Sequence, residues 1–510
     1  MPAEPGQINT TAHRARPTVQ SPALGRTTAR GAAWMIGQAV GSKLVSFGSQ
    51  IALTALLMPE DFGLVALAYT VRAFTDKLQD PGITAVLVQR SRHFERWMNP
   101  AFWMSLSSGV MAMCIMLAAI PLAVWFYGEP GLVGLMLVLA LSAPLDTLRT
   151  VPRARLSSQM RFGTLAGLDL AMLILQMGLS IALAATGFGA YSFVMPLPVM
   201  YAVRTGVLWS LARPRVRWAL QLRRWRHLLN DTVFVFATYM ARTLYWQGDY
   251  IVLGRLHGTD VVGVYFFAFT LSTQTLFLLA GNLSSVLFPA LSRLTQEPAR
   301  QKAGFRQAID VLAMIGIPMA LLQAAVADPV VRLVFTPRWY DGIPVLQVLS
   351  VGMAIRMVGA LGSSLTQANG RFKLQASVDG CYAVMFLTAV SISALYGAAL
   401  TVAITVAICS SIFGLVNMYV AMRQVGGGWA DAVGPYLRPT LIGGGACAAG
   451  WAAAQTVTLE NQETVQQLLR LAITLVVSLG VYLPLIRMAD RPTWDLAMMR
   501  FKTLLRRGES

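Results

Sequence analysis

The sequence has 510 residues, of which 55% are hydrophobic and only 13% are charged, and its formal net charge at pH 7 is +18. Soluble domains carry about 25% charged residues, so this composition excludes an ordinary soluble protein and predicts an all-α integral membrane protein. The basic residues lie in short loops between apolar runs, where membrane topology and anionic lipid headgroups explain them better than nucleic acid does. We therefore expect membrane lipids, and no nucleic acid, among its partners.

Residues 1–30 are polar and rich in arginine and proline, without the apolar core of a signal peptide. We interpret them as a disordered cytoplasmic tail, and residues 489–510 as a second cytoplasmic tail. The four cysteines fall inside apolar runs without metal-ligand spacing, so they predict small apolar core residues, with no metal site and no cofactor.

Apolar runs separated by polar breaks predict about fourteen transmembrane helices, because a helix needs about 20 residues to cross the hydrocarbon core. The predicted ranges are 32–57, 63–88, 100–126, 132–151, 164–186, 189–211, 231–253, 261–290, 307–335, 343–366, 374–396, 398–421, 433–454 and 467–487.

The first two predicted helices carry charges at membrane depth. These charged residues are Lys43, Arg72, Asp76, Lys77 and Asp80. A charge in the hydrocarbon costs a few kcal/mol or more unless it faces a partner or a wet cavity. This hairpin is therefore expected to line a polar space inside a helix bundle.

Loop charges alternate regularly along the chain. Basic loops, such as those around Arg149–Arg161 and Arg213–Arg226, alternate with short acidic or neutral loops; Arg255 and Arg338 are exceptions. The positive-inside rule then predicts a multi-pass membrane protein with both termini in the cytoplasm. Aromatic residues at the outer helix ends, including Trp125 and Trp339, fit an interfacial belt.

A weak internal repeat divides the chain into two halves. The turn from Leu57 to Gly63 resembles the turn from Leu256 to Gly263, because each places an acidic residue just before a glycine that opens the next helix. Repeated halves are common in secondary transporters, which bind substrate between them. The resulting domain prediction is a six-helix N-lobe (31–212), a basic cytoplasmic linker (213–230), a six-helix C-lobe (231–422) and two further helices (423–488).

Three segments together resemble the polysaccharide transporters of the MOP superfamily, the Wzx-type flippases of lipid-linked oligosaccharides. The first is the start of the second helix, 59–66 (PEDFGLVA), and the second is the kinked end of that helix, with 79–82 (QDPG) and 87–89 (LVQ). The third is the exit of the fourth helix, 152–156 (PRARL), followed by Arg161-Phe162. The similarity covers residues 28–490, and the order of the motifs carries it.

The resemblance implies two six-helix lobes around a central cavity, as in MOP and MATE-like transporters. It also implies that an undecaprenyl-pyrophosphate-linked sugar repeat unit moves from the cytoplasmic to the periplasmic leaflet. Such a protein supplies exopolysaccharide, capsule or O-antigen assembly, with a polysaccharide polymerase and chain-length machinery as further partners. In the related lipid II flippases the two additional helices form a groove for the lipid tail, and the last two helices here are candidates for the same role.

A pyrophosphate in a low-dielectric cavity needs fixed cations, and arginine suits phosphate through its bidentate fork. Six basic residues within the predicted helices are candidates: Arg242, Arg356, Lys43, Arg72, Lys77 and Arg204. The alternative for Arg72 and Lys77 is pairing with Asp76 and Asp80 on the same helix face, and Arg204 could extend to the cytoplasmic surface. No acid lies within four residues of Arg242 or Arg356, which makes these two the preferred candidates.

Three further residues, Tyr245, Trp246 and Gln247, are candidate sugar contacts, with ordinary helix packing as the alternative. Asp76, Asp80 and Asp249 are candidates for ion coupling, because burial raises the pKa of a carboxylate and makes it a protonation switch. Asp379 is a further acid at membrane depth.

No motif for hydrolysis or group transfer is present in the sequence, so a catalytic site is not expected and the protein is predicted not to be an enzyme. Two alternatives to a flippase remain open at this point. One is a MATE-type multidrug or cation antiporter, which would need a net acidic cavity. The other is a membrane-embedded polysaccharide polymerase, which would need larger loops.

Overall fold

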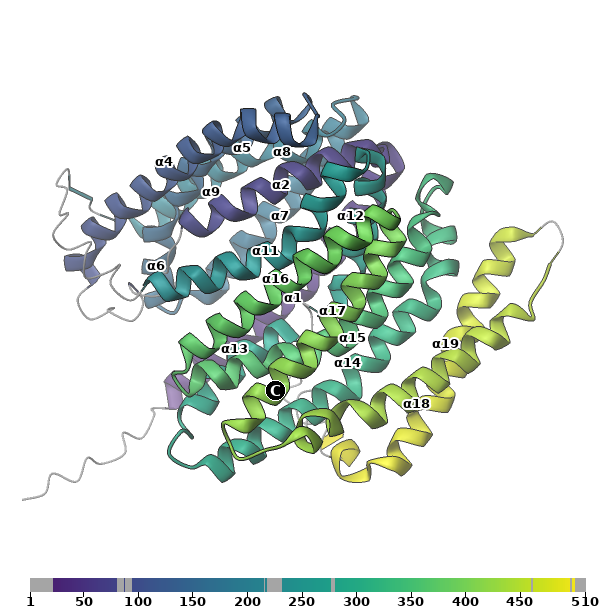
Figure 1. Ribbon diagram of the computed structural model, residues 1–510. Helices are drawn as coiled ribbons and strands as arrows, with labels where there is room; N and C mark the ends of the chain where they lie inside the picture. The colour runs from purple at the N-terminus through teal and green to yellow at the C-terminus, as the bar shows by residue number, and fades with distance from the viewer. Residues whose placement is uncertain are drawn as a thin grey trace, which may run out of the picture.

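The computed structural model describes residues 22–79, 87, 94–214, 216–217, 232–276, 280–459, 462–495 and 498–499, and within these ranges the chain consists of helices and connecting turns (Figure 1). The first helix begins at Pro22, inside the stretch predicted to be a disordered tail. Proline is favourable in the first turn of a helix, which explains the earlier start. Most of the predicted linker at 213–230, and Asp80, lie outside the described residues.

We use N-lobe for the helices before residue 213 and C-lobe for those between 231 and 424. The N-lobe contains α1 (Pro22–Leu56), α2 (Pro59–Gln79), α4 (Phe94–Tyr127), α5 (Leu132–Thr147), α6 (Thr150–Ser158), α7 (Phe162–Ala185), α8 (Tyr191–Val194) and α9 (Pro196–Ala212). The C-lobe contains α11 (Thr232–Leu256), α12 (Thr259–Leu276), α13 (Asn282–Ser292), α14 (Pro298–Val334), η3 (Pro337–Trp339), α15 (Gly342–Ala368), α16 (Phe372–Tyr396) and α17 (Ala399–Arg423). Two further helices follow, α18 (Trp429–Gln455) and α19 (Glu463–Ala489).

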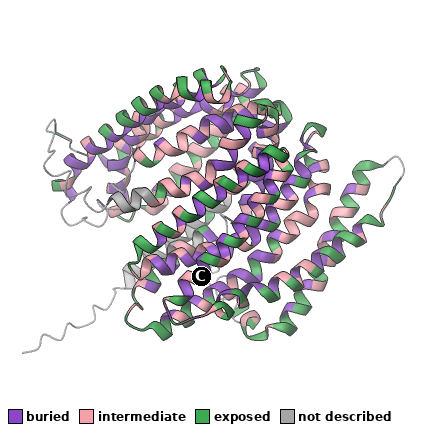
Figure 2. Cartoon of the chain, in the orientation of Figure 1, coloured by how far each residue is buried: buried purple, intermediate pink, exposed green. Residues whose placement is uncertain are grey.

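The helices have the lengths and the apolar surfaces of a membrane protein. In the described part of the chain, nine helical segments are long and apolar enough to cross a bilayer. Each of the fourteen predicted ranges overlaps one helix or two consecutive helices, although the end of the range 63–88 lies mostly outside the described residues, and fourteen membrane crossings remain a prediction. Figure 2 shows buried residues concentrated where the lobes meet and exposed residues along the outer faces of α18 and α19. Many of these exposed residues are large and apolar, as lipid contact requires.

The lobes meet through the two repeated turns. We call this end of the molecule the acidic side, because Asp61 and Asp260 lie in these turns. A Cβ atom on Gly63 would lie 1.8 Å from the carbonyl oxygen of Thr259, and one on Gly263 would lie 1.8 Å from that of Pro59. No side chain fits at such distances, so glycine at both positions allows α2 and α12 to pack backbone against backbone (Figure 1).

Trp339 also joins the two lobes on the acidic side. Its indole N–H donates to the carbonyl of Thr54 at 2.9 Å, and its ring lies 4.8 Å from that of Phe62. Trp339 is fully buried, so its prediction as an interfacial belt residue is wrong. Its apolar ring fills the space between the lobes while its one polar group is satisfied, which is a stable arrangement for a buried tryptophan. Trp125 is 78% exposed, as an interfacial position requires.

The last two helices pack on α14 and on each other (Figure 1). Lys302 of α14 donates to Asp431 in the first turn of α18 at 2.8 Å, and Arg306 of α14 donates to the Asp431 backbone carbonyl at 3.1 Å. A Cβ on Gly450 would lie 2.2 Å from the Ser478 hydroxyl, so this glycine lets α18 approach α19 closely. Ionic contacts at the end and small residues in the middle thus attach both helices to the C-lobe.

Candidate functional site

Four predicted cations lie at one depth in four different helices. α1 and α11 end on the acidic side, and α2 and α15 begin there. Lys43, Arg72, Arg242 and Arg356 each lie about 20 Å along their helix from that end, at 1.5 Å per residue. The fold therefore brings charges that are far apart in sequence to a common level, beyond the closed contact between the lobes.

A polar cavity of about 400 Å³ opens at this level in the C-lobe. Its polar lining consists of Arg242, Arg356, Ser284, Ser363, Ser364, Gln367 and Asn417, and its apolar lining of Tyr245, Trp246, Phe288, Ala360 and Phe413. Two of the six predicted cations and two of the three predicted sugar contacts thus face one space. Among the described residues that line the cavity there is no carboxylate.

Arg356 is a buried cation that is held without a carboxylate. Only 4% of the residue is exposed. Its Nη1 donates to the Ser410 hydroxyl at 3.0 Å, and its guanidinium lies 3.9 Å from the centre of the Trp246 ring. Nη2 is buried and has no hydrogen-bond partner within the described structure. Leaving a buried charge partly unsatisfied costs several kcal/mol, so Arg356 stays a candidate for binding an anionic ligand.

Arg242 has a partner that its local sequence does not reveal. Its Nε donates to Asp379 of α16 at 2.9 Å, across 137 residues of sequence. The expectation that Arg242 is unpaired is therefore wrong, because helix packing supplied an acid that spacing along one helix could not predict. The Arg242 side chain remains 28% exposed, and it lines the cavity.

The cations of the N-lobe are engaged elsewhere. Arg72 pairs with Asp76 at 3.3 Å and donates to the Tyr201 hydroxyl at 2.6 Å, so the alternative of internal pairing describes its contacts. Lys43 donates to the Gln274 side chain of α12 at 2.7 Å, which links the two lobes. Lys77 is exposed, and its ammonium lies 5.8 Å from the centre of the Tyr239 ring.

Arg204 forms an ion pair with Asp169, which also pairs with Arg153 at 3.0 Å. This contact joins α9 to α7 and α6 within the N-lobe. The predicted alternative is that the Arg204 side chain extends to the cytoplasmic surface. Arg204 instead binds an acid within the N-lobe. Asp169 escaped notice in the sequence because it lies on a different helix from both of its partners.

The candidate coupling acids differ in their surroundings. Asp76 is bound to Arg72, as described above. Asp249 is 1% exposed and accepts hydrogen bonds from the Tyr265 hydroxyl at 2.7 Å and from the Tyr250 backbone N–H at 3.0 Å. In the described ranges, Asp249 has no ion pair with a basic residue. It is thus a buried acid that phenol and amide groups hold in place.

The predicted sugar contacts are largely occupied by protein. Trp246 lies against Arg356, and Tyr245 is buried against Tyr382, with 4.8 Å between the ring centres. Gln247 accepts a hydrogen bond from Thr70 of α2 at 3.1 Å, which is another contact between the lobes. The contact between Trp246 and Arg356 suits Trp246 to holding this arginine in position. A role of Trp246 in sugar binding stays a prediction.

Several cavity residues were missed, although a helical pattern in the sequence marks them. Ser363, Ser364 and Gln367 follow Arg356 at spacings that place them on one face of α15. Phe413 and Asn417, four residues apart on α17, form a similar pair, and Ser410, which binds Arg356, precedes them by one turn. Reading polar residues at helical spacing from Arg356 would have identified the α15 wall.

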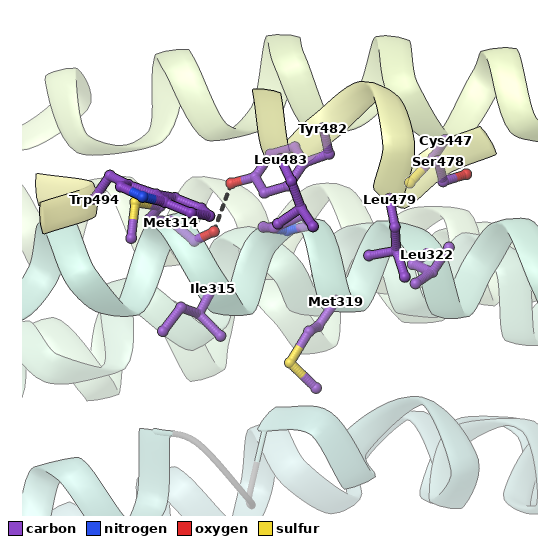
Figure 3. A pocket seen from close by; sticks show the side chains of 11 residues that line it. Met314, Ile315, Met319, Leu322, Cys447, Ser478, Leu479, Tyr482, Leu483 and Trp494 are labelled. Carbon is purple, nitrogen blue, oxygen red and sulfur yellow. Dashed lines mark hydrogen bonds between the residues drawn. The ribbon is translucent and has the colours of Figure 1, made fainter. Parts of the chain in front are cut away.

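A second, apolar pocket of about 180 Å³ lies between α14, α18 and α19 (Figure 3). Met314, Met319, Leu479, Tyr482 and Trp494 are among its lining residues. The Tyr482 hydroxyl donates to the Met314 carbonyl, so the one phenol there is satisfied by protein, and apart from the Ser478 hydroxyl the remaining surface is mainly apolar. Such a pocket suits a hydrocarbon chain, in line with the lipid-groove role expected of these two helices, which remains a prediction.

The two lobes, the charged cavity and the outer apolar faces define a helical membrane transporter, and solved structures share its fold. The inward closed form of the lipid II flippase MurJ matches with a TM-score of 0.69 and 14% identity, over 89% of this chain and 99% of that one. An inward-facing multidrug resistance MATE family transporter of the MOP superfamily matches with a TM-score of 0.62 and 17% identity, over 76% and 94% of the two chains. The predicted MOP and MATE-like fold is confirmed.

Sequence comparison identifies the family within this class. The model of the family described as "Polysaccharide biosynthesis protein" matches residues 52–344, and the chain belongs to this family. The teichuronic acid biosynthesis protein TuaB of Bacillus subtilis is 23% identical over 72% of this chain and 78% of its own length. The succinoglycan biosynthesis transport protein ExoT of Rhizobium meliloti is 26% identical over 66% of this chain and 68% of its own length.

Proposed function

We propose that the protein is a flippase for lipid-linked oligosaccharides that works by alternating access. It moves an undecaprenyl-pyrophosphate-linked repeat unit from the cytoplasmic to the periplasmic leaflet of the inner membrane. Its family membership and relatives named for polysaccharide biosynthesis and transport support this function. The flipped repeat units would pass to a polysaccharide polymerase and its chain-length machinery.

One observation carries the proposal: the free Nη2 of Arg356 beside a cavity that Arg242 also lines. Two guanidinium groups in a low-dielectric space replace the hydration of a pyrophosphate as it leaves the headgroup layer. Trp246 and Ser410 hold Arg356 in place, while Asp249 and Asp379 act on its charge from beyond ion-pair distance. The site is therefore preorganised for a dianion.

The orientation follows from the charges of the loops. The acidic side, where Gly63 and Gly263 meet, would face the periplasm, and the basic loops and both termini would face the cytoplasm. The contacts between the lobes on the acidic side then belong to a state that admits substrate from the cytoplasm. Opening of the glycine contact would release the headgroup on the other side.

The alternative of a cation antiporter requires acidic groups in the cavity. The described lining contains two arginines and no carboxylate, which favours an anion at the cavity surface, although Asp379 pairs with Arg242 from behind. The similarity to a MATE transporter concerns the fold alone. A polymerase would need catalytic groups, and the family and the relatives named for transport support a transporter that catalyses no reaction.

For ion coupling we favour Asp249 over Asp76. Asp249 is buried and forms no ion pair in the described structure, although Arg356 acts on its charge from a distance, whereas Asp76 is bound to Arg72. Asp80 lies outside the described residues and stays a candidate from sequence.

The test measures lipid-linked oligosaccharide on each leaflet in a deletion strain complemented with variants. Arg356→Met should lower flux by about tenfold or more, because hydrogen bonds to charged groups contribute about 1.5–3 kcal/mol. The matched control is Arg423→Met, since Arg423 is exposed at the end of α17. Normal flux in both Arg356→Met and Arg242→Met, at wild-type protein levels, would refute the assigned site.

A further inference from the structure

A carboxylate lies directly behind the cavity. The Asp379 side chain has no exposed area, whereas the Arg242 side chain that it holds is 28% exposed. Arg242 lines the cavity, and Asp379 is not among the lining residues. Arg242 therefore stands between the cavity and a hidden negative charge.

Asp379 is fixed in its position. The Gln375 side-chain amide donates to Asp379 Oδ1 at 3.2 Å, and both residues are at most 1% exposed. Asn417, which lies 3.5 Å from the Gln375 amide, is itself anchored by a 2.8 Å hydrogen bond to the Gly359 carbonyl. The carboxylate thus cannot follow a ligand into the cavity.

Arg242, in contrast, is partly exposed, and its bond to Asp379 engages one nitrogen of the guanidinium, Nε. The Nη1–Nη2 edge of a guanidinium is the other face that can grip two oxygens of one phosphate group. Asp379 lies on the buried side of Arg242, and the cavity lies on its exposed side. The guanidinium can therefore bind either Asp379 or an anion in the cavity.

We propose that Asp379 is an internal counter-anion that competes with the substrate diphosphate for Arg242 and so sets the affinity of the cavity. This inference rests on the proposed function. Two arginines in a low-dielectric space would hold a dianion too firmly for rapid release. When the diphosphate leaves, Arg242 returns to Asp379, and the departing charge is replaced from within the protein.

A purely structural role for Asp379 makes the opposite prediction. If the carboxylate only stabilises a partly buried arginine, its removal leaves the site disordered and binding weaker or unchanged. If it competes with the ligand, its removal makes diphosphate binding tighter and release slower. The sign of the change in affinity therefore separates the two roles.

The experiment measures binding of farnesyl diphosphate to the full-length protein in lipid nanodiscs by calorimetry. Asp379→Asn should bind about tenfold more tightly than wild type, because the variant loses the negative charge that competes with the diphosphate for Arg242. Farnesol, which lacks the charge, should bind both proteins equally. Asp328→Asn is the matched control, since Asp328 pairs with Arg332 at 2.7 Å in α14, away from the cavity, and should leave the affinity unchanged.

A double-mutant cycle tests whether Asp379 acts through Arg242. The gain from Asp379→Asn should largely disappear in an Arg242→Gln background, and a full gain there would overturn the proposal. Asp379→Ser provides a second neutral variant; loss of folded protein in both neutral variants would also overturn it, by assigning Asp379 to stability.

The outcomes distinguish this inference from the proposed function. Equal or weaker binding in Asp379→Asn, with binding still lost in Arg356→Met, overturns the counter-anion alone. Wild-type binding in Arg356→Met overturns the proposed site, and the counter-anion with it.

Discussion

The two lobes place arginines at the same depth but treat their charges differently. In the N-lobe, Arg72 is bound by Asp76 and Tyr201 from its own lobe. In the C-lobe, Arg356 is held by an aromatic face and a hydroxyl, and one N–H remains without a partner in the described structure. Arg72 thus has a carboxylate within hydrogen-bonding distance, whereas Arg356 has only neutral groups at that distance. We therefore propose a structural role for Arg72 and a binding role for Arg356.

The lobes are most alike at the glycine contact, and this is where we expect the largest effect. Gly63→Ala places a methyl group where the Thr259 carbonyl lies, so the acidic side cannot close. Flux should fall by about thirtyfold or more, and labelling of a Thr54→Cys reporter by a membrane-impermeant maleimide should increase. Gly167→Ala, with nothing within 4 Å of its Cβ, is the control. Unchanged labelling in Gly63→Ala would show that this contact does not keep the acidic side closed.

Removing each lobe's arginine should then separate stability from binding. Arg72→Met leaves Asp76 without its partner and should lower the free energy of unfolding by about 1–3 kcal/mol, less than a fully buried pair because Asp76 is partly exposed. Arg72→Met/Asp76→Leu should recover much of this loss. Thermal unfolding in detergent measures it, and farnesyl diphosphate affinity should stay near wild type. A large loss of affinity would break the distinction between the lobes.

The acids provide a third contrast. If Asp249 couples an ion gradient to transport, Asp249→Asn should lower flux by about tenfold and make the residual flux insensitive to a protonophore. Asp76→Asn should keep the protonophore response of wild type, because Asp76 is committed to Arg72. Flux in proteoliposomes with and without an imposed pH gradient checks both variants. A full protonophore response in Asp249→Asn would show that another group couples the ion gradient to transport.

The smallest effect is expected at Trp246. A cation–π contact contributes about 0.5–2 kcal/mol. Trp246→Ala should therefore weaken farnesyl diphosphate binding by about three- to tenfold, and Trp246→Phe by less, since a ring is retained. Trp125→Ala, at a position 78% exposed, is the control. Loss of sugar-dependent binding with unchanged diphosphate affinity would instead make Trp246 a sugar contact.

Much of the fold was predictable from the sequence, because membrane burial imposes strong patterns. Apolar length and loop charge marked the helices, and the repeated turns with Gly63 and Gly263 marked the halves. Their direct contact was not predictable, since similarity between two segments does not say that they touch. Trp339 was misread for a related reason: an aromatic residue at a helix end resembles a belt residue until the neighbouring lobe covers it.

The site was only partly predictable. Arg242 and Arg356 could be singled out because they lie at mid-helix without a local acid. The pairing of Arg242 with Asp379 could not, because it depends on how α11 packs against α16. Spacing along one helix detects partners such as Arg72 and Asp76, and it is blind to partners on another helix.

The glycine contact has a consequence for inhibition. At each glycine, the backbone of the other lobe occupies the place where a side chain would lie. This contact, the seam between the lobes, therefore has room for nothing larger than a hydrogen atom. In the proposed orientation this seam borders the periplasm. A small molecule that wedged a methyl-sized group into it would hold the halves apart without ever crossing the inner membrane.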